Sequence, residues 1–124
     1  MHTMRNASAK LGTLNFTPED LQKIEDLKAT ADANPVGEGE SLPESRRGVV
    51  CGIEIAWFLM VDREDGIGQY RLFIRGECGQ PDLSVVQAMA VPFFATNPYE
   101  IMPYPKDPCV VRVSSLFFPY SEGQ

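Results

Sequence analysis

The sequence is almost without histidine, and this absence limits the chemistry that the chain can perform. The only histidine among its 124 residues is His2, close to the N-terminus. Histidine is the usual proton carrier of enzymes at neutral pH, and both Ser-His-Asp and Cys-His arrangements would have to use this one ring. A structural zinc site usually takes four Cys or His ligands. We therefore expect a protein that is not an enzyme and that needs no metal or other cofactor.

Cysteines and long apolar runs are also scarce. The three cysteines, Cys51, Cys78 and Cys109, are odd in number, widely spaced and without a Cys-x-x-Cys pair, a pattern typical of a reducing compartment rather than of a disulfide framework. The longest apolar run extends from Ile55 to Val61, whereas a membrane-spanning helix needs about 20 residues. The first thirty residues contain no apolar stretch followed by a cleavage site. These features predict a cytoplasmic protein without a membrane span.

An excess of basic residues is likewise missing. The chain has 17 Asp and Glu against 11 Lys and Arg, a net charge of −6, and the acidic excess is concentrated in the segment 19–44. A general nucleic-acid binder needs a basic surface to neutralise phosphates, so we expect no direct nucleic-acid binding. The acidic segment is compatible with a basic protein partner. The alternative is that it is a solvated helix face followed by a polar linker.

The first clear structural signal is a helix that begins after Thr17. Thr17 is a good N-cap, Pro18 suits the first helical position, and the Asn34-Pro35 pair ends the pattern. The apolar side chains repeat every three to four residues, which indicates one amphipathic stripe: Leu21, Ile24 and Leu27. We accordingly expect an N-terminal arm at 1–16 and a single α+β domain at 17–124, with an acidic linker at 35–47.

From Gly48 onward the apolar residues recur at every second position instead of every third or fourth. This alternation predicts a β-hairpin with strands at about 49–62 and 67–78. A two-residue turn at Asp65-Gly66 would pair Trp57 with Ile74 and Leu59 with Leu72. All four apolar side chains then share one face, where Cys51 and Cys78 would also pack. The opposite face is mixed, because it combines aromatic and thioether groups with arginines.

The residues that follow the hairpin predict one short helix, one extended loop and one final strand. Asp82 begins a short helix at about 82–91 and Pro92 stops it. Four prolines between Asn97 and Pro108 favour an extended, polyproline-like loop. A final strand follows at about 109–118.

Two features are candidate partner-binding sites, and both consist of residues common at protein interfaces. The first is the mixed hairpin face, and the second is the Pro/Tyr loop. The candidate residues are Phe58, Met60, Arg71, Phe73 and Arg75 on the hairpin and Tyr99, Met102 and Tyr104 in the loop. For the hairpin face the alternative is that the N-terminal helix covers Phe58 and Phe73.

The absence of a catalytic constellation beside two contact surfaces leads to the function we expect. It is a non-catalytic protein-binding module, acting as an adaptor, an inhibitor or an assembly subunit. One alternative is a structural subunit of a homo-oligomer or large particle. Another is a small enzyme or ligand-binding protein with an aromatic pocket near Trp57 and Tyr70.

Overall fold

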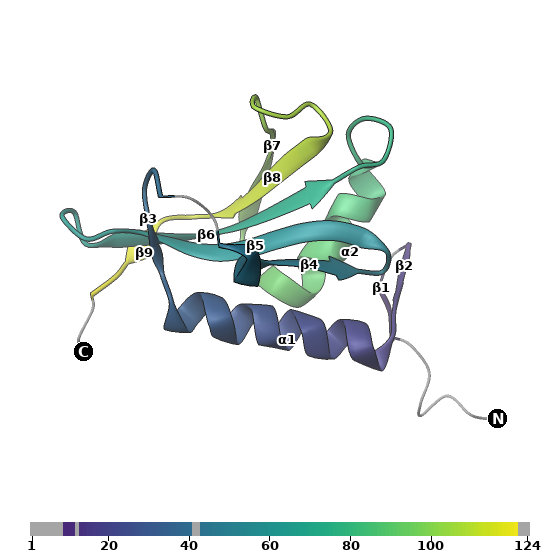
Figure 1. The fold of residues 1–124 in the computed structure, drawn as a ribbon, viewed down its shortest axis with the longest axis horizontal. Helices are drawn as coiled ribbons and strands as arrows, with labels where there is room; N and C mark the ends of the chain where they lie inside the picture. The colour runs from purple at the N-terminus through teal and green to yellow at the C-terminus, as the bar shows by residue number, and fades with distance from the viewer. Residues whose placement is uncertain (1–8, 12, 41–42, 122–124) are drawn as a thin grey trace.

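The computed structural model describes residues 9–11, 13–40 and 43–121 (Figure 1). These ranges contain two α-helices and one short 3-10 helix, with strands before, between and after them. The elements in chain order are β1 (Ala9–Leu11), β2 (Leu14–Phe16), α1 (Pro18–Ala33), β3 (Val36–Gly37), η2 (Glu44–Arg46), β4 (Arg47–Val50), β5 (Ile53–Asp62), β6 (Ile67–Arg75), α2 (Leu83–Phe94), β7 (Tyr99–Pro103), β8 (Val110–Ser115) and β9 (Phe118–Pro119).

The first helix, α1, begins where the sequence predicts. The N–H of Asp20 donates to Thr17 Oγ1 and the N–H of Thr17 donates to Asp20 Oδ2, both at 3.0 Å, so the two residues form a capping box. Asp20 Oδ1 also accepts the N–H of Cys51 at 3.1 Å. Desolvation raises the pKa of Asp20, but the N–H groups of Thr17 and Cys51 outweigh it and hold the pKa below its usual value. One carboxylate therefore caps the helix and joins it to the sheet.

The sheet has the order β3-β5-β6-β8-β7, with β4 also paired to β5 and β9 to β6. The strand β3 runs parallel to β5, and the other pairs are antiparallel. Both helices contribute to the core on one face of this sheet, and Figure 1 shows α1 running beneath β4 and β5. The α+β class is confirmed.

The central hairpin has the predicted faces but not the predicted register. Trp57 pairs with Leu72 and Leu59 with Tyr70, which is a shift of two residues from the expected pairing. The loop is longer than a two-residue turn because Asp62 Oδ1 accepts the N–H groups of Glu64 and Asp65 at 3.0 and 3.1 Å. Gly66, at a φ of 68°, then donates to the carbonyl of Asp62. A shift of two keeps every side chain on its face, so the face assignment survives the error.

The strand expected at 49–62 is two strands joined by a tight turn. Cys51 and Gly52 both have positive φ, at 55° and 74°, and Val50 pairs with Ile53 across them. A two-residue turn places Val50 on the same face as Ile53, so Val50 is buried and Val49 is 56% exposed. Cys51 thus lies in a turn and not in a strand, but it is partly buried and packs against the main core as expected. Cys78 lies exposed beyond β6, which ends at Arg75.

The described parts of the segments predicted as arm and linker contribute to the body of the protein. Leu14 and Phe16, in the segment 1–16, are 8% and 0% exposed and belong to the main core. Within 35–47, Val36 is buried and pairs with Met60. Hydrophobic side chains inside polar segments thus tie both to the sheet.

The C-terminal third contains more regular structure than the sequence predicts. The second helix, α2, continues past Pro92 to Phe94, because Phe93 and Phe94 pack into the core. Lys28 Nζ donates to the carbonyl of Pro92 at 3.1 Å and holds α1 to α2. The expected extended loop contains the edge strand β7, where Pro103 is tolerated because an edge strand has a free side. The final strand is divided into β8 and β9.

The main core is built around Trp57, which is 2% exposed. Its ring stacks on Tyr70 at 5.1 Å and contacts Phe93 and Phe94 of α2 at 4.7 and 5.3 Å. The Tyr70 hydroxyl donates to Asp32 of α1 at 2.6 Å. These rings fill the space in which the sequence allowed an aromatic pocket.

No helix in the described ranges is long and apolar enough to cross a membrane.

Replacing Asp20 by Ala should lower the free energy of unfolding at pH 7 by about 1 to 2 kcal/mol, because the hydrogen bonds that its carboxylate accepts from the N–H groups of Thr17 and Cys51 are both lost. The folded state lowers the pKa of Asp20, so its contribution is present above the pKa of the unfolded chain and is lost as the pH falls through the lowered value. Urea unfolding of both proteins from pH 7 to pH 2.5 measures this. If the two proteins differed in unfolding free energy by the same amount at pH 7 and at pH 2.5, the lowered pKa of Asp20 would be contradicted.

Candidate binding face

The sheet face opposite the helices, here called the open face, contains most of the residues that the sequence singled out. Alternation along the paired strands places Phe58, Arg71 and Phe73 together on this side of β5 and β6. Neither helix covers it, so the expectation that α1 lies across Phe58 and Phe73 is wrong. The physical reason is that α1 buries Ile24 and Leu27 against the larger apolar face around Trp57.

A hollow of about 530 Å³ lies on the open face. Its floor is formed by β5, β6 and β8, and its sides by the segments 36–40 and 102–106. Six of the eight predicted residues line it: Phe58, Met60, Arg71, Phe73, Met102 and Tyr104. Arg75 instead lines a smaller neighbouring hollow of about 220 Å³, which shares Phe73 and Tyr104 with the larger one. The hairpin face and the loop, predicted as separate sites, therefore form one surface.

Tyr99 is the predicted residue that does not join this surface. It lies on the other side of the sheet, where its ring is 5.1 Å from that of Phe94. The alternation of β7 explains the difference, since Tyr99 and Met102 are an odd number of residues apart and point to opposite faces. An extended loop, as expected from the sequence, has no such alternation.

The apolar part of the hollow is a row of aromatic rings. The centroids of Phe58 and Phe73 are 5.6 Å apart, and those of Phe73 and Tyr104 are 4.9 Å apart. Phe58 and Met60 are each 6% exposed, because they pack with Val36 and Phe73 in a small second core. Phe73 and Tyr104 stay half-buried. A partner side chain that enters the hollow would therefore contact Phe73 and Tyr104 before it contacts Phe58 or Met60.

The charged side chains of the hollow are two arginines on its floor, Arg71 of β6 and Arg112 of β8, with Glu38, Glu40 and Lys106 on its sides. Arg71 Nε donates to Gln69 Oε1 at 2.8 Å, and Arg112 Nη2 lies 2.8 Å from Met102 Sδ. Arg112 Nε is buried and has no hydrogen-bond partner. Within the described ranges, neither arginine forms an ion pair with a carboxylate.

The two cations also act on each other. Burial lowers the pKa of Arg71, the charge of Arg112 lowers it further, and Glu38 partly offsets both effects. The sequence analysis missed Arg112. A signal was present, because Arg112 is a charged residue between Val111 and Val113 in a strand of period two, which assigns it to the face opposite these valines.

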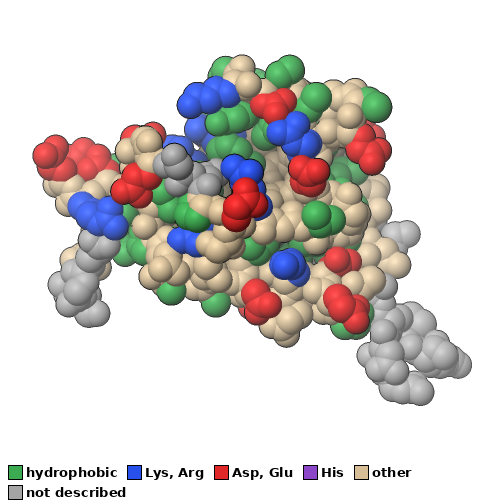
Figure 2. All heavy atoms as spheres, viewed as in Figure 1, with side chains coloured by type: hydrophobic (Ala, Val, Ile, Leu, Met, Phe, Trp, Pro, Cys, Tyr) green, Lys and Arg blue, Asp and Glu red, His purple; other side chains and the backbone are tan. Residues whose placement is uncertain are grey.

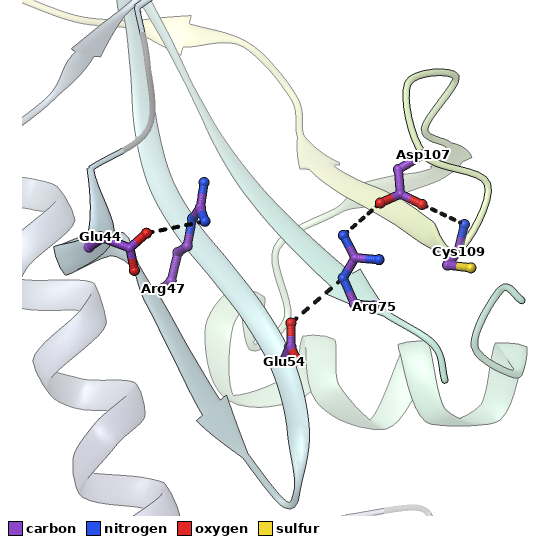
Figure 3. A network of polar contacts seen from close by, with 6 residues as sticks. All are labelled: Glu44, Arg47, Glu54, Arg75, Asp107 and Cys109. Carbon is purple, nitrogen blue, oxygen red and sulfur yellow. Dashed lines mark hydrogen bonds and ion pairs between the residues drawn. The ribbon is translucent and has the colours of Figure 1, made fainter. Parts of the chain in front are cut away.

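Arg75, by contrast, is neutralised within the protein (Figure 3). Its guanidinium lies 2.6 Å from Asp107 and 3.6 Å from Glu54, and the contact with Asp107 raises its pKa. The second oxygen of Asp107 accepts the N–H of Cys109 at 3.0 Å, which orders the turn after β7. Arg47 is paired with Glu44 at 3.3 Å in the same view. This end of the sheet presents no unpaired positive charge from Arg75 or Arg47.

Among the described residues, metal-ligating side chains do not cluster and the thiol of Cys51 is not activated. No group of three or more His, Cys, Asp or Glu within the described ranges could hold a metal ion. Burial, and then the charge of Asp20, raises the pKa of Cys51 to about 11, so its sulfur is a thiol at neutral pH and a poor nucleophile. His2 lies outside the described residues.

No family model, curated protein or solved structure matches this chain.

Arg71 and Arg112 have no carboxylate partner in the described ranges, so we expect them to favour binding at the expense of stability. Replacing Arg112 by Met should raise the free energy of unfolding by about 1 kcal/mol, because it removes repulsion with Arg71 and a buried N–H without a partner. Arg75→Met is the matched control and should not stabilise the protein, because Arg75 has two carboxylate partners. Urea denaturation measures both, and a destabilised Arg112→Met protein would show that Arg112 serves the fold.

Proposed function

We propose that this chain is a non-catalytic protein-binding module that contacts its partner through the open face and the adjoining turn after β7. The observation that carries the proposal is the hollow on the open face, where half-buried aromatic rings lie beside two arginines without carboxylate partners. Aromatic residues, methionine and arginine are the types most enriched at protein interfaces. An adaptor, an inhibitor and an assembly subunit would each use such a surface.

The turn after β7 supports the proposal because its backbone is ordered before binding. The N–H of Tyr104 donates to the carbonyl of Val110, and the N–H of Asp107 donates to the carbonyl of Tyr104. Three prolines, Pro103, Pro105 and Pro108, further restrict this segment. Docking against it therefore loses little conformational entropy.

The setting we propose is cytoplasmic, with a protein as the partner. The segment 19–44 allows contact with a basic protein at a second surface, whereas the open face is itself positively charged at Arg71 and Arg112. In the view of Figure 2, Lys and Arg side chains are interspersed with Asp and Glu and form no continuous basic stripe. A nucleic acid is therefore a poor fit to that side of the molecule.

Capture of partners from the native host tests this function. The double substitution Phe73→Ala with Tyr104→Ala should remove the partners retained by the wild-type protein, because it deletes two half-buried rings of the open face. The control is Leu83→Ala with Val91→Ala, which removes exposed apolar side chains of α2, 60% and 42% exposed. Quantitative mass spectrometry of the three captures gives the readout, with circular dichroism to check folding.

Two results would count against the proposal. One is a set of partners that survives in the folded Phe73→Ala, Tyr104→Ala protein. The other is an equal loss in the Leu83→Ala, Val91→Ala control, which would place the contact on the helical side of the molecule.

A second candidate function, a structural subunit that associates with copies of itself, is favoured by a different observation. The strand β6 pairs with β8 at Arg71 and Ser114 and with β9 at Gly68 and Phe118. Between these two pairs the chain that joins β8 to β9 has one residue more than β6, so it forms a bulge. Leu116 and Phe117 in this bulge are 56% and 59% exposed. Two adjacent exposed apolar side chains on an ordered segment are a candidate contact between copies.

If the chain assembles through this bulge, light scattering should show a mass that rises with concentration in the micromolar range. The double substitution Leu116→Ser with Phe117→Ser should then return it to the monomer, because it removes the apolar contact. A wild-type protein that is monomeric throughout this range excludes self-assembly and leaves the binding-module proposal standing.

A further inference from the structure

We propose that the hollow on the open face holds a carboxylate of the partner between Arg71 and Arg112, with a large apolar side chain of the same segment against the aromatic row. This inference rests on the proposed function, and it names the chemistry of the partner: an acidic segment of a protein in which Asp or Glu stands near an aromatic or aliphatic residue.

The first support is that both arginines are partly removed from water without a carboxylate partner among the residues that the structure describes. Arg71 and Arg112 are half-buried, and burial already lowers the pKa of Arg71. Taking a cation out of water costs free energy unless an anion or hydrogen-bond acceptors replace the water. Arg112 Nε is buried and has no acceptor, so the fold itself satisfies this guanidinium only in part.

The second support is the spacing of the two side chains. Arg71 pairs with Ser114 across β6 and β8, and Arg112 is two residues before Ser114 on the same strand. Such diagonal neighbours on one sheet face stand roughly 7–8 Å apart at their backbones, a distance that long side chains can bridge. One carboxylate can therefore accept hydrogen bonds from both guanidinium groups, which are the strong, charge-assisted kind.

The third support is the apolar surface next to these cations. Phe73 pairs directly with Arg112 in the sheet and its ring contacts those of Phe58 and Tyr104. The hollow, at about 530 Å³, is large enough for a bulky side chain beside the carboxylate. A segment that supplied charge alone would leave the half-buried rings of Phe73 and Tyr104 unused.

The charges around the hollow favour a carboxylate on a protein over the phosphates of a nucleic acid. Glu38, Glu40 and Lys106 line the same hollow, and Glu38 acts electrostatically on Arg71 without an ion pair between them. A chain of phosphates would bring several negative charges toward these glutamates and toward a protein of net charge −6. A single carboxylate on an apolar segment avoids most of this repulsion.

The test is selection of random peptides displayed on phage against three immobilised proteins: wild type, Arg71→Gln with Arg112→Gln, and Lys23→Gln. The wild type should enrich peptides with Asp or Glu near a large apolar residue. Lys23→Gln should enrich the same peptides, because Lys23 is an exposed cation of α1 and does not line the hollow. The double variant, checked for folding by thermal melting, should not.

Synthetic forms of an enriched peptide then measure the contribution of the carboxylate. Changing its Asp to Asn, or Glu to Gln, should weaken binding to the wild type by about tenfold to a hundredfold, the loss expected for a charge-assisted hydrogen bond. The same change should have little effect on binding to Arg71→Gln, Arg112→Gln. Binding should also weaken with added salt.

The outcomes separate this inference from the proposed function. Enriched peptides that lack acids, but still need Phe73 and Tyr104, would overturn the carboxylate and leave the binding module intact. A selection that enriches nothing on the open face overturns the carboxylate as well, and the capture experiment with Phe73→Ala, Tyr104→Ala then decides the function on its own. Tighter binding of an oligo(U) RNA than of any peptide would overturn both.

Discussion

The burial of Trp57 beneath both helices is the interaction on which the rest of the structure depends. Its ring contacts Tyr70 in the sheet and Phe93 and Phe94 in α2, and α1 is joined to the same cluster by the bond from Tyr70 to Asp32. Because the large apolar face takes both helices, none is left to cover the opposite face. The open face is thus a consequence of where the strongest packing lies.

The open face is divided by how its arginines are paired. Arg75 lies between Glu54 and Asp107 and completes a network that orders the turn after β7. Arg71 and Arg112 have no such partners in the described ranges, and they repel each other beside a row of aromatic rings. The same residue type therefore forms ion pairs at one end of the sheet and has none, within the described ranges, at the other end. Pairing, more than the number of charges, defines the candidate site.

The sequence predicts the faces of the sheet well, because alternation depends only on the apolar pattern. Trp57 and Leu72 lie on one side and Phe58 and Phe73 on the other, as expected. The register is not predictable in the same way, since it depends on the side chain of Asp62 in the loop. The turn at Cys51-Gly52 was also missed, because a cysteine at positive φ is rare and the apolar run continues across it.

The site itself was predicted in part for the same reason. Residues on the hairpin were found by alternation, but Arg112 and Met102 meet them only because β7 and β8 add to the sheet beside β6. No local pattern specifies which strands become neighbours when their paired residues are 35 or more positions apart in the sequence, as Arg75 and Val110 are. Tyr99 shows the opposite error. Tyrosine is a residue type common at interfaces, but the position of Tyr99 in β7 places its ring on the core side with Phe94. Tertiary pairing turns two weak sequence signals into one surface, and this is why the geometry around Arg71 and Arg112 carries a more specific hypothesis than either segment alone.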